Sequence, residues 1–219
     1  MSSLTVPLIR QQKYSVDCGV ACVAMLLEYY GVPHDYKKLR KEIGVFHFGT
    51  FMPQLGLYLI KRGFEIEIIT MHPALFTLFT TFANERELVE HLTSVRKILP
   101  QKHDRIGLNF FLQFIQAGGV VTPRIPVTQD IQKEIDYNRP LLCSLTHRLL
   151  FKSELKPKFS FHFNIITGYN AKKIYVNDPD WEDECGGERE HAMQGYLYAI
   201  YANVHGFIDG ASIMKIKQS

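Results

Sequence analysis

A chain of 219 residues, 46% of them hydrophobic, can bury one sizeable core, and its length favours one elaborated domain over two. The formal net charge is only +3, and the Lys and Arg residues are scattered, which argues against a nucleic-acid partner. No basic N-terminal stretch precedes a long apolar run, and no apolar run reaches membrane-spanning length. We therefore expect a soluble, cytoplasmic protein without a membrane span.

The four cysteines are expected to be reduced thiols. Cys18 and Cys22 are four residues apart on a predicted helix, and the chain is not a small disulfide-rich one. A metal site that combined this pair with Cys185 and His191 would match no established spacing of zinc ligands. We predict neither a metal nor a cofactor.

The first seventy residues are predicted to be mainly helical. A helix is expected over 18–30, because Asp17 is a favoured N-cap residue and the sequence GVP at 31–33 supplies a stop. Apolar stripes with helical spacing, and then an alternation of apolar and acidic residues, follow along the chain. The stripes predict short helices over 35–43 and 53–61, and the alternation predicts a half-buried strand over 64–69.

Residues 71–118 are predicted to form a helical insertion in a single domain that spans 1–219. Helical spacing recurs over 85–99 and 108–117, whereas the aromatic-rich segment 72–82 has no clear period. We interpret that aromatic segment as core or as a packed cover.

The second half of the chain is predicted to be richer in strands. A helix is expected over 128–138, with Thr128 or Asp130 as its cap. Runs of β-branched and aromatic residues between turn signals predict strands over 120–122, 140–145, 161–169 and 173–178, with 195–204 and 211–216 completing the sheet. Helices first and antiparallel strands later indicate an α+β domain, in which N-terminal helices pack on an antiparallel sheet.

Cys18 lies where the first predicted helix begins. A thiol in a first helical turn meets the positive end of the helix dipole and free N–H groups, and both favour the thiolate. Gly19 allows a substrate backbone to approach, and the Gln12 amide is a candidate oxyanion donor beside the Cys18 N–H. A cysteine on an apolar helix is more often a buried hydrophobe, which is our interpretation of Cys22.

A catalytic thiol also needs an imidazole and a group that orients it. His162 lies in a strand-like run, and Asp178 ends the next predicted strand. Paired strands lie about 5 Å apart, so a hairpin would bring these two side chains within reach. Alternative residues remain for two of the roles. They are His47, His147 and His191 as the base and Gln11 as the oxyanion donor.

The sequence QKYSVDCGVAC at 12–22, with LLEYYG at 26–31, resembles the N-terminal motif of bacteriocin-processing, double-glycine leader peptidases. These are papain-like cysteine peptidases that are usually fused to ABC transporters. The block HFNIITGY at 162–169, leading to NDP at 177–179, is also similar to that family. The resemblance implies a stand-alone relative with a papain-like fold and a peptide or protein substrate. It implies four site residues: Cys18 as nucleophile, His162 as base, Asp178 as orienting acid and Gln12 as oxyanion donor.

We therefore predict a cysteine peptidase that hydrolyses a peptide bond through a thioacyl intermediate. Two alternatives keep the fold and change the function. One is an inactive peptide-binding module. The other is a thiol-dependent acyl transferase, because an amine can capture a thioacyl group in place of water.

Overall fold

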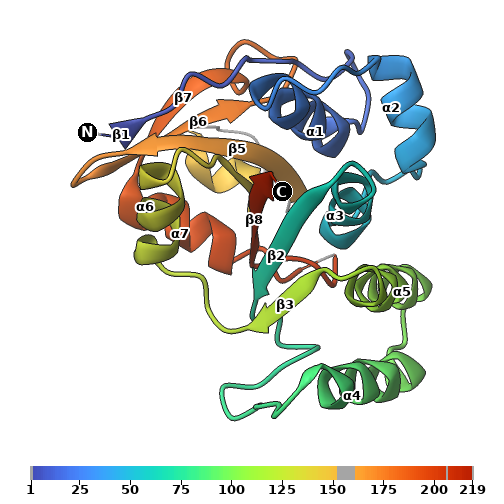
Figure 1. Ribbon diagram of the computed structural model, residues 1–219. Helices are drawn as coiled ribbons and strands as arrows, with labels where there is room; N and C mark the ends of the chain where they lie inside the picture. The colour runs from blue at the N-terminus through green and yellow to red at the C-terminus, as the bar shows by residue number, and fades with distance from the viewer. Residues whose placement is uncertain (1, 152–160, 206, 219) are drawn as a thin grey trace.

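The computed structural model describes residues 2–151, 161–205 and 207–218 (Figure 1). The helices are α1 (Cys18–Tyr29), α2 (Tyr36–Ile43), α3 (Met52–Ile60), α4 (Glu85–Ile98), α5 (Lys102–Gln116), α6 (Thr128–Asp136) and α7 (Met193–Tyr201), with a 3-10 helix η1 (His147–Leu150). The strands are β1 (Ser2–Ser3), β2 (Phe64–Thr70), β3 (Val120–Pro123), β4 (Leu141–Thr146), β5 (Phe161–Tyr169), β6 (Lys173–Asp178), β7 (Gly187–Ala192) and β8 (Ser212–Gln218).

One curved sheet organises the molecule, in the order β3-β2-β8-β4-β5-β6-β7, and β1 pairs with β5 (Figure 1). Every described pair is antiparallel except β2 with β3. The prediction of an antiparallel sheet is therefore wrong for that pair. Residues between β2 and β3 form α4 and α5, and parallel neighbours need such a long crossover.

Apolar side chains cover both faces of the sheet. On one face, α1, α3 and α5 bury a core that includes Leu26, Leu55 and Phe111. On the other face, α6 and α7 bury a second core around Ile135 and Tyr196. Figure 1 shows α1 and α3 on the opposite side of the sheet from α6 and α7. The strand that carries His162 thus has a packed layer on each side.

Most predicted elements are confirmed, but the strand predicted over 195–204 is wrong. The helix α7 covers most of that range, and its buried residues Met193, Tyr196 and Ile200 recur at helical spacing. The strand β7, at the edge of the sheet, was missed because its sequence GEREHA is largely charged. The predicted α+β class is confirmed.

The predicted insertion, residues 71–118, contains α4 and α5. α4 packs against α5, and α5 packs against α3. That this range is an insertion in a single domain remains a prediction. Among the described residues, no helix combines the length and the apolar character needed to cross a bilayer.

Candidate active site

Cys18 is the first residue of α1 and is half-buried, whereas the next nine residues of the helix are buried. Asp17 occupies the predicted N-cap position, but its side chain caps no backbone N–H. Both of its carboxylate oxygens accept from Arg40 Nε, at 3.0 and 2.9 Å. An ion pair between the buried Asp17 carboxylate and the exposed Arg40 of α2 therefore fixes the residue before the thiol.

Gly19 lets the beginning of α1 pack tightly against the loop that precedes α3. A Cβ on Gly19 would lie 2.3 Å from Thr50 Oγ1 and 2.9 Å from Leu55 Cδ1. Both contacts are shorter than real Cβ atoms show. Glycine at this position is therefore a packing requirement, and it sets the position of Cys18.

His162 and Asp178 meet across the β5–β6 pair. The register places Ile165 opposite Asn177, so Asp178 falls opposite Asn164. His162 is two residues before Asn164 and therefore lies on the same face of β5. His162 Nε2 lies 2.8 Å from Asp178 Oδ1, and both residues are buried. The sequence-predicted pair is thus brought together.

The electrostatics of this pair favour an imidazolium beside a carboxylate. Burial alone would raise the Asp178 pKa, but the charge of His162, its hydrogen-bond contact and the nearby His147 hold that pKa well below its usual range. Burial alone would lower the His162 pKa, but Asp178 and the side chain of Cys18 raise it well above its usual range. Because Asp178 engages Nε2, Nδ1 is the nitrogen left for the Cys18 thiol.

Further contacts hold Asp178 in place. Its Oδ1 accepts from the Asp180 N–H at 3.0 Å, and its Oδ2 accepts from Asn164 Nδ2 at 3.4 Å. The Oδ1 of Asn164 accepts from Tyr196 on α7 at 2.6 Å. The second core therefore supports the carboxylate through Asn164.

His147 is a second imidazole at this site. Its ring stacks on His162 with centroids 4.1 Å apart, and its Nε2 lies 3.3 Å from Asp178 Oδ2. Sequence reasoning placed His147 only among the alternative bases. The available signal was its position directly after β4, the strand that pairs Leu145 with His162.

Gln12 lies in the loop before α1 with its side chain exposed to solvent, and its carbonyl accepts from the Ser15 N–H at 3.0 Å. Gln11, the alternative donor, is half-buried, and its N–H donates to the carbonyl of Pro179 at 2.8 Å. That bond ties the loop to the segment after Asp178. The oxyanion role of Gln12 stays a prediction.

The other two alternative bases lie outside the Cys18–His162–Asp178 group. His47 is exposed and contacts Phe48, and His191 on β7 contacts Phe151 and Tyr196. All four cysteines are free, and burial raises the Cys22 pKa well above its usual value. Cys22 is fully buried, in keeping with its interpretation as a packed hydrophobe.

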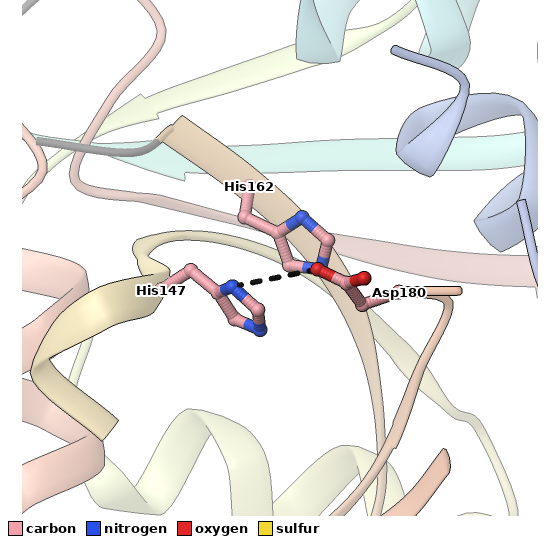
Figure 2. A group of neighbouring side chains, drawn as sticks. All are labelled: His147, His162 and Asp180. Atoms are coloured by element: carbon pink, nitrogen blue, oxygen red, sulfur yellow. Dashed lines mark ion pairs between the residues drawn. The ribbon is translucent and has the colours of Figure 1, made fainter. Parts of the chain in front are cut away.

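His147, His162 and Asp180 are the described side chains that come closest to a metal-ligand set, with donor atoms within 4.8 Å of one another (Figure 2). The dashed line in Figure 2 joins His147 Nδ1 to Asp180 Oδ2, at 3.8 Å. The two rings stack at 30°, and His162 Nε2 already contacts the Asp178 carboxylate. These residues therefore fit a carboxylate–imidazole cluster better than a metal.

Half-buried aromatic residues extend from the site towards α5. Phe161, which precedes His162, contacts Phe207 with ring centroids 4.6 Å apart, and Phe207 contacts Phe48 at 5.5 Å. Phe46 stacks on Phe48 and contacts Phe110. We call these five residues the aromatic wall; sequence analysis did not single them out, because they are far apart along the chain.

The model of the Peptidase_C39 like family matches residues 3–206. No curated protein matches the chain significantly. Among solved structures, the fold is similar to that of a double glycine motif protease from an AMS/PCAT transporter in complex with the leader peptide, with 14% identity over 100% of this chain and 99% of that chain and a TM-score of 0.50. It is also similar to the peptidase domain of Streptococcus ComA, a bi-functional ABC transporter involved in a quorum sensing pathway, with 14% identity over 97% and 98% of the two chains and a TM-score of 0.51. The chain therefore belongs to the Peptidase_C39 like family and has the papain-like fold expected of it.

Proposed function

We propose that the protein is a cysteine peptidase that hydrolyses a peptide bond through a thioacyl intermediate. The observation that carries this proposal is the 2.8 Å contact between His162 and Asp178, with Cys18 raising the His162 pKa from the other side of the ring. The arrangement supports Cys18 as nucleophile, His162 as base and Asp178 as orienting acid, the three roles that thiol catalysis requires.

The proposed reaction has two halves. His162 takes the proton of Cys18, and the thiolate attacks the scissile carbonyl carbon. The Cys18 N–H and the Gln12 amide stabilise the oxyanion, and His162 then gives its proton to the leaving amine. In the second half, His162 deprotonates a water molecule, which attacks the thioester and releases the carboxylic acid and the thiol.

A peptide substrate is supported by family membership and by the related protease that was crystallised with a leader peptide. The aromatic wall begins at Phe161, the residue that precedes His162 in β5, and offers that substrate a half-buried apolar surface. Gln12 must turn its amide towards the thiol for the oxyanion role, because its side chain is exposed here. This exposure is the one observation that favours the alternative of a peptide-binding module that does not cut.

Cleavage of a peptide library, followed by mass spectrometry, tests the proposal. The native protein is expected to release new termini, whereas Cys18→Ala is expected to bind the same peptides and leave them whole. Cys22→Ala is the matched control and is expected to cut. Peptides that bind the native protein but remain uncut would support the binding module. Products joined to an added amine would instead indicate an acyl transferase.

A further inference from the structure

We propose that His147 is a positioning residue of the same site: a neutral imidazole whose N–H holds the second oxygen of Asp178, so that the first oxygen stays on His162. This inference rests on the proposed function. It assigns His147 a role in which it touches neither the substrate nor the sulfur.

The geometry divides the Asp178 carboxylate between two imidazoles. Oδ1 lies 2.8 Å from His162 Nε2, and Oδ2 lies 3.3 Å from His147 Nε2. His147 Nε2 lies at ion-pair distance from Oδ2 without forming an aligned hydrogen bond, and the donor that Oδ2 already has is Asn164, at a long 3.4 Å. The Asp180 N–H holds Oδ1, so without His147 the second oxygen is left to the long contact with Asn164 alone, which weakens the hold on the carboxylate's orientation.

The charges assign different protonation states to the two rings. One buried carboxylate can neutralise one imidazolium, and the rings lie only 4.1 Å apart, where two positive charges repel. Burial and the charge of His162 lower the His147 pKa, whereas the His162 pKa is raised. His162 therefore carries the proton and His147 stays neutral. We place the N–H of His147 on Nε2, because Nε2 lies nearer to a carboxylate oxygen, at 3.3 Å from Asp178, than Nδ1 does, at 3.8 Å from Asp180.

The surroundings of His147 bury its ring. The ring is buried beneath Phe151, with centroids 4.7 Å apart. The ionisable groups that face it are His162 on β5, Asp178 at the end of β6, Asp180 beyond it, and His191 on β7. Removal of the imidazole would admit water beside Asp178, which weakens the field that the carboxylate exerts on His162.

Two substitutions separate this role from simple packing. His147→Gln keeps an N–H donor but loses the stacked ring, whereas His147→Phe keeps a stacked ring but loses the donor. His191→Gln is the control, because this nearby histidine has no ion pair or hydrogen bond to Asp178 among the interactions described. Thermal unfolding of each variant checks that it folds.

The readout is the rate at which iodoacetamide alkylates Cys18, measured from about pH 5 to pH 9 by peptide mass spectrometry, because this rate follows the thiolate. His147→Phe is expected to slow labelling below pH 7 by about 10- to 100-fold, the loss typical of a hydrogen bond to a charged group. His147→Gln is expected to stay within about threefold of the native rate, as is His191→Gln.

Two results would overturn the positioning role. One is an equal rate of Cys18 alkylation in the native protein and in His147→Phe. The other is a greater loss of that rate in His147→Gln than in His147→Phe. The proposed function survives that result if His162→Ala still slows labelling. A native protein that labels like a free thiol, near pKa 8.5, overturns both, because no ion pair then exists to be positioned. Nitrogen chemical shifts of the His147 ring provide a second measurement: protonation of its Nδ1 at pH 7 would also refute the neutral Nε2–H tautomer.

Discussion

The exchange of Asp178 for Asn isolates the charge that orients the proposed base. The side chain keeps its size, so the buried contacts with Asn164 and the Asp180 N–H are retained in shape. The change removes the negative charge 2.8 Å from His162 Nε2. If the Asn amide donates to His162 Nε2, the ring proton moves to Nδ1. Nδ1 can then no longer accept a proton from Cys18.

The expected loss follows from the bond that is removed. A hydrogen bond between charged groups contributes about 1.5 to 3 kcal/mol, and about 1.4 kcal/mol corresponds to one factor of ten. The ion pair of Cys18 and His162 should therefore weaken by about 10- to 100-fold. The His162 pKa, which Asp178 raises, should fall, and the thiolate should form only at higher pH.

The assay is the pH profile of Cys18 alkylation, with Asp183→Asn as the matched control. Asp183 is exposed and pairs with Arg10 at 3.1 Å, so its loss is expected to leave the profile unchanged. A folded Asp178→Asn protein that labels Cys18 at the native rate below pH 7 would refute the reasoning. If Asp178→Asn does not fold, the same profile is measured on Asp178→Glu. That variant keeps the negative charge but displaces the carboxylate from His162.

Three other changes have expected outcomes. Gly19→Ala should lower the free energy of unfolding by about 1 to 3 kcal/mol, because the new Cβ collides with Thr50 and Leu55. Chemical denaturation measures this loss, and an unchanged midpoint would show that the loop before α3 moves aside without cost. Burial raises the Asp209 pKa to about 7, so the contribution of this carboxyl to the free energy of unfolding should fall as pH rises from about 4 to about 7. Asp209→Asn should remove that contribution, and a variant with the native pH dependence of stability would contradict it. Phe161→Ala should raise KM for cleaved peptides by about tenfold with little change in kcat, and an equal fall in kcat would place Phe161 in the chemistry instead.

Local sequence determined the pieces of the site that depend on nearby residues. The turn at 169–172 and the flanking strands predict a hairpin that brings the segments of His162 and Asp178 together. The register that places both side chains on one face also depends on an irregularity between Ile166 and Gly168, which the local pattern did not predict. The position of Cys18 follows from the residues that begin α1. Each of these features rests on backbone periodicity and turn chemistry, which short stretches of chain carry by themselves.

Long-range packing decided the rest. The charged sequence of β7 and the apolar helix α7 were misread because their environments, a sheet edge and a buried core, lie outside the local pattern. The parallel pairing of β3 depends on how α4 and α5 cross the sheet edge. A periodic pattern indicates which face of a helix or strand is apolar, but it does not indicate which element packs on that face.

The site itself shows the same division. The residue types and order of Cys18, His162 and Asp178 were readable along the chain, together with the helix start and the hairpin that hold them. Only the tertiary structure stacked His147 on His162 and turned Gln12 to solvent. The physical reason is that these arrangements depend on contacts between residues that are far apart in the sequence. Such contacts form only when helices pack on the two faces of the sheet.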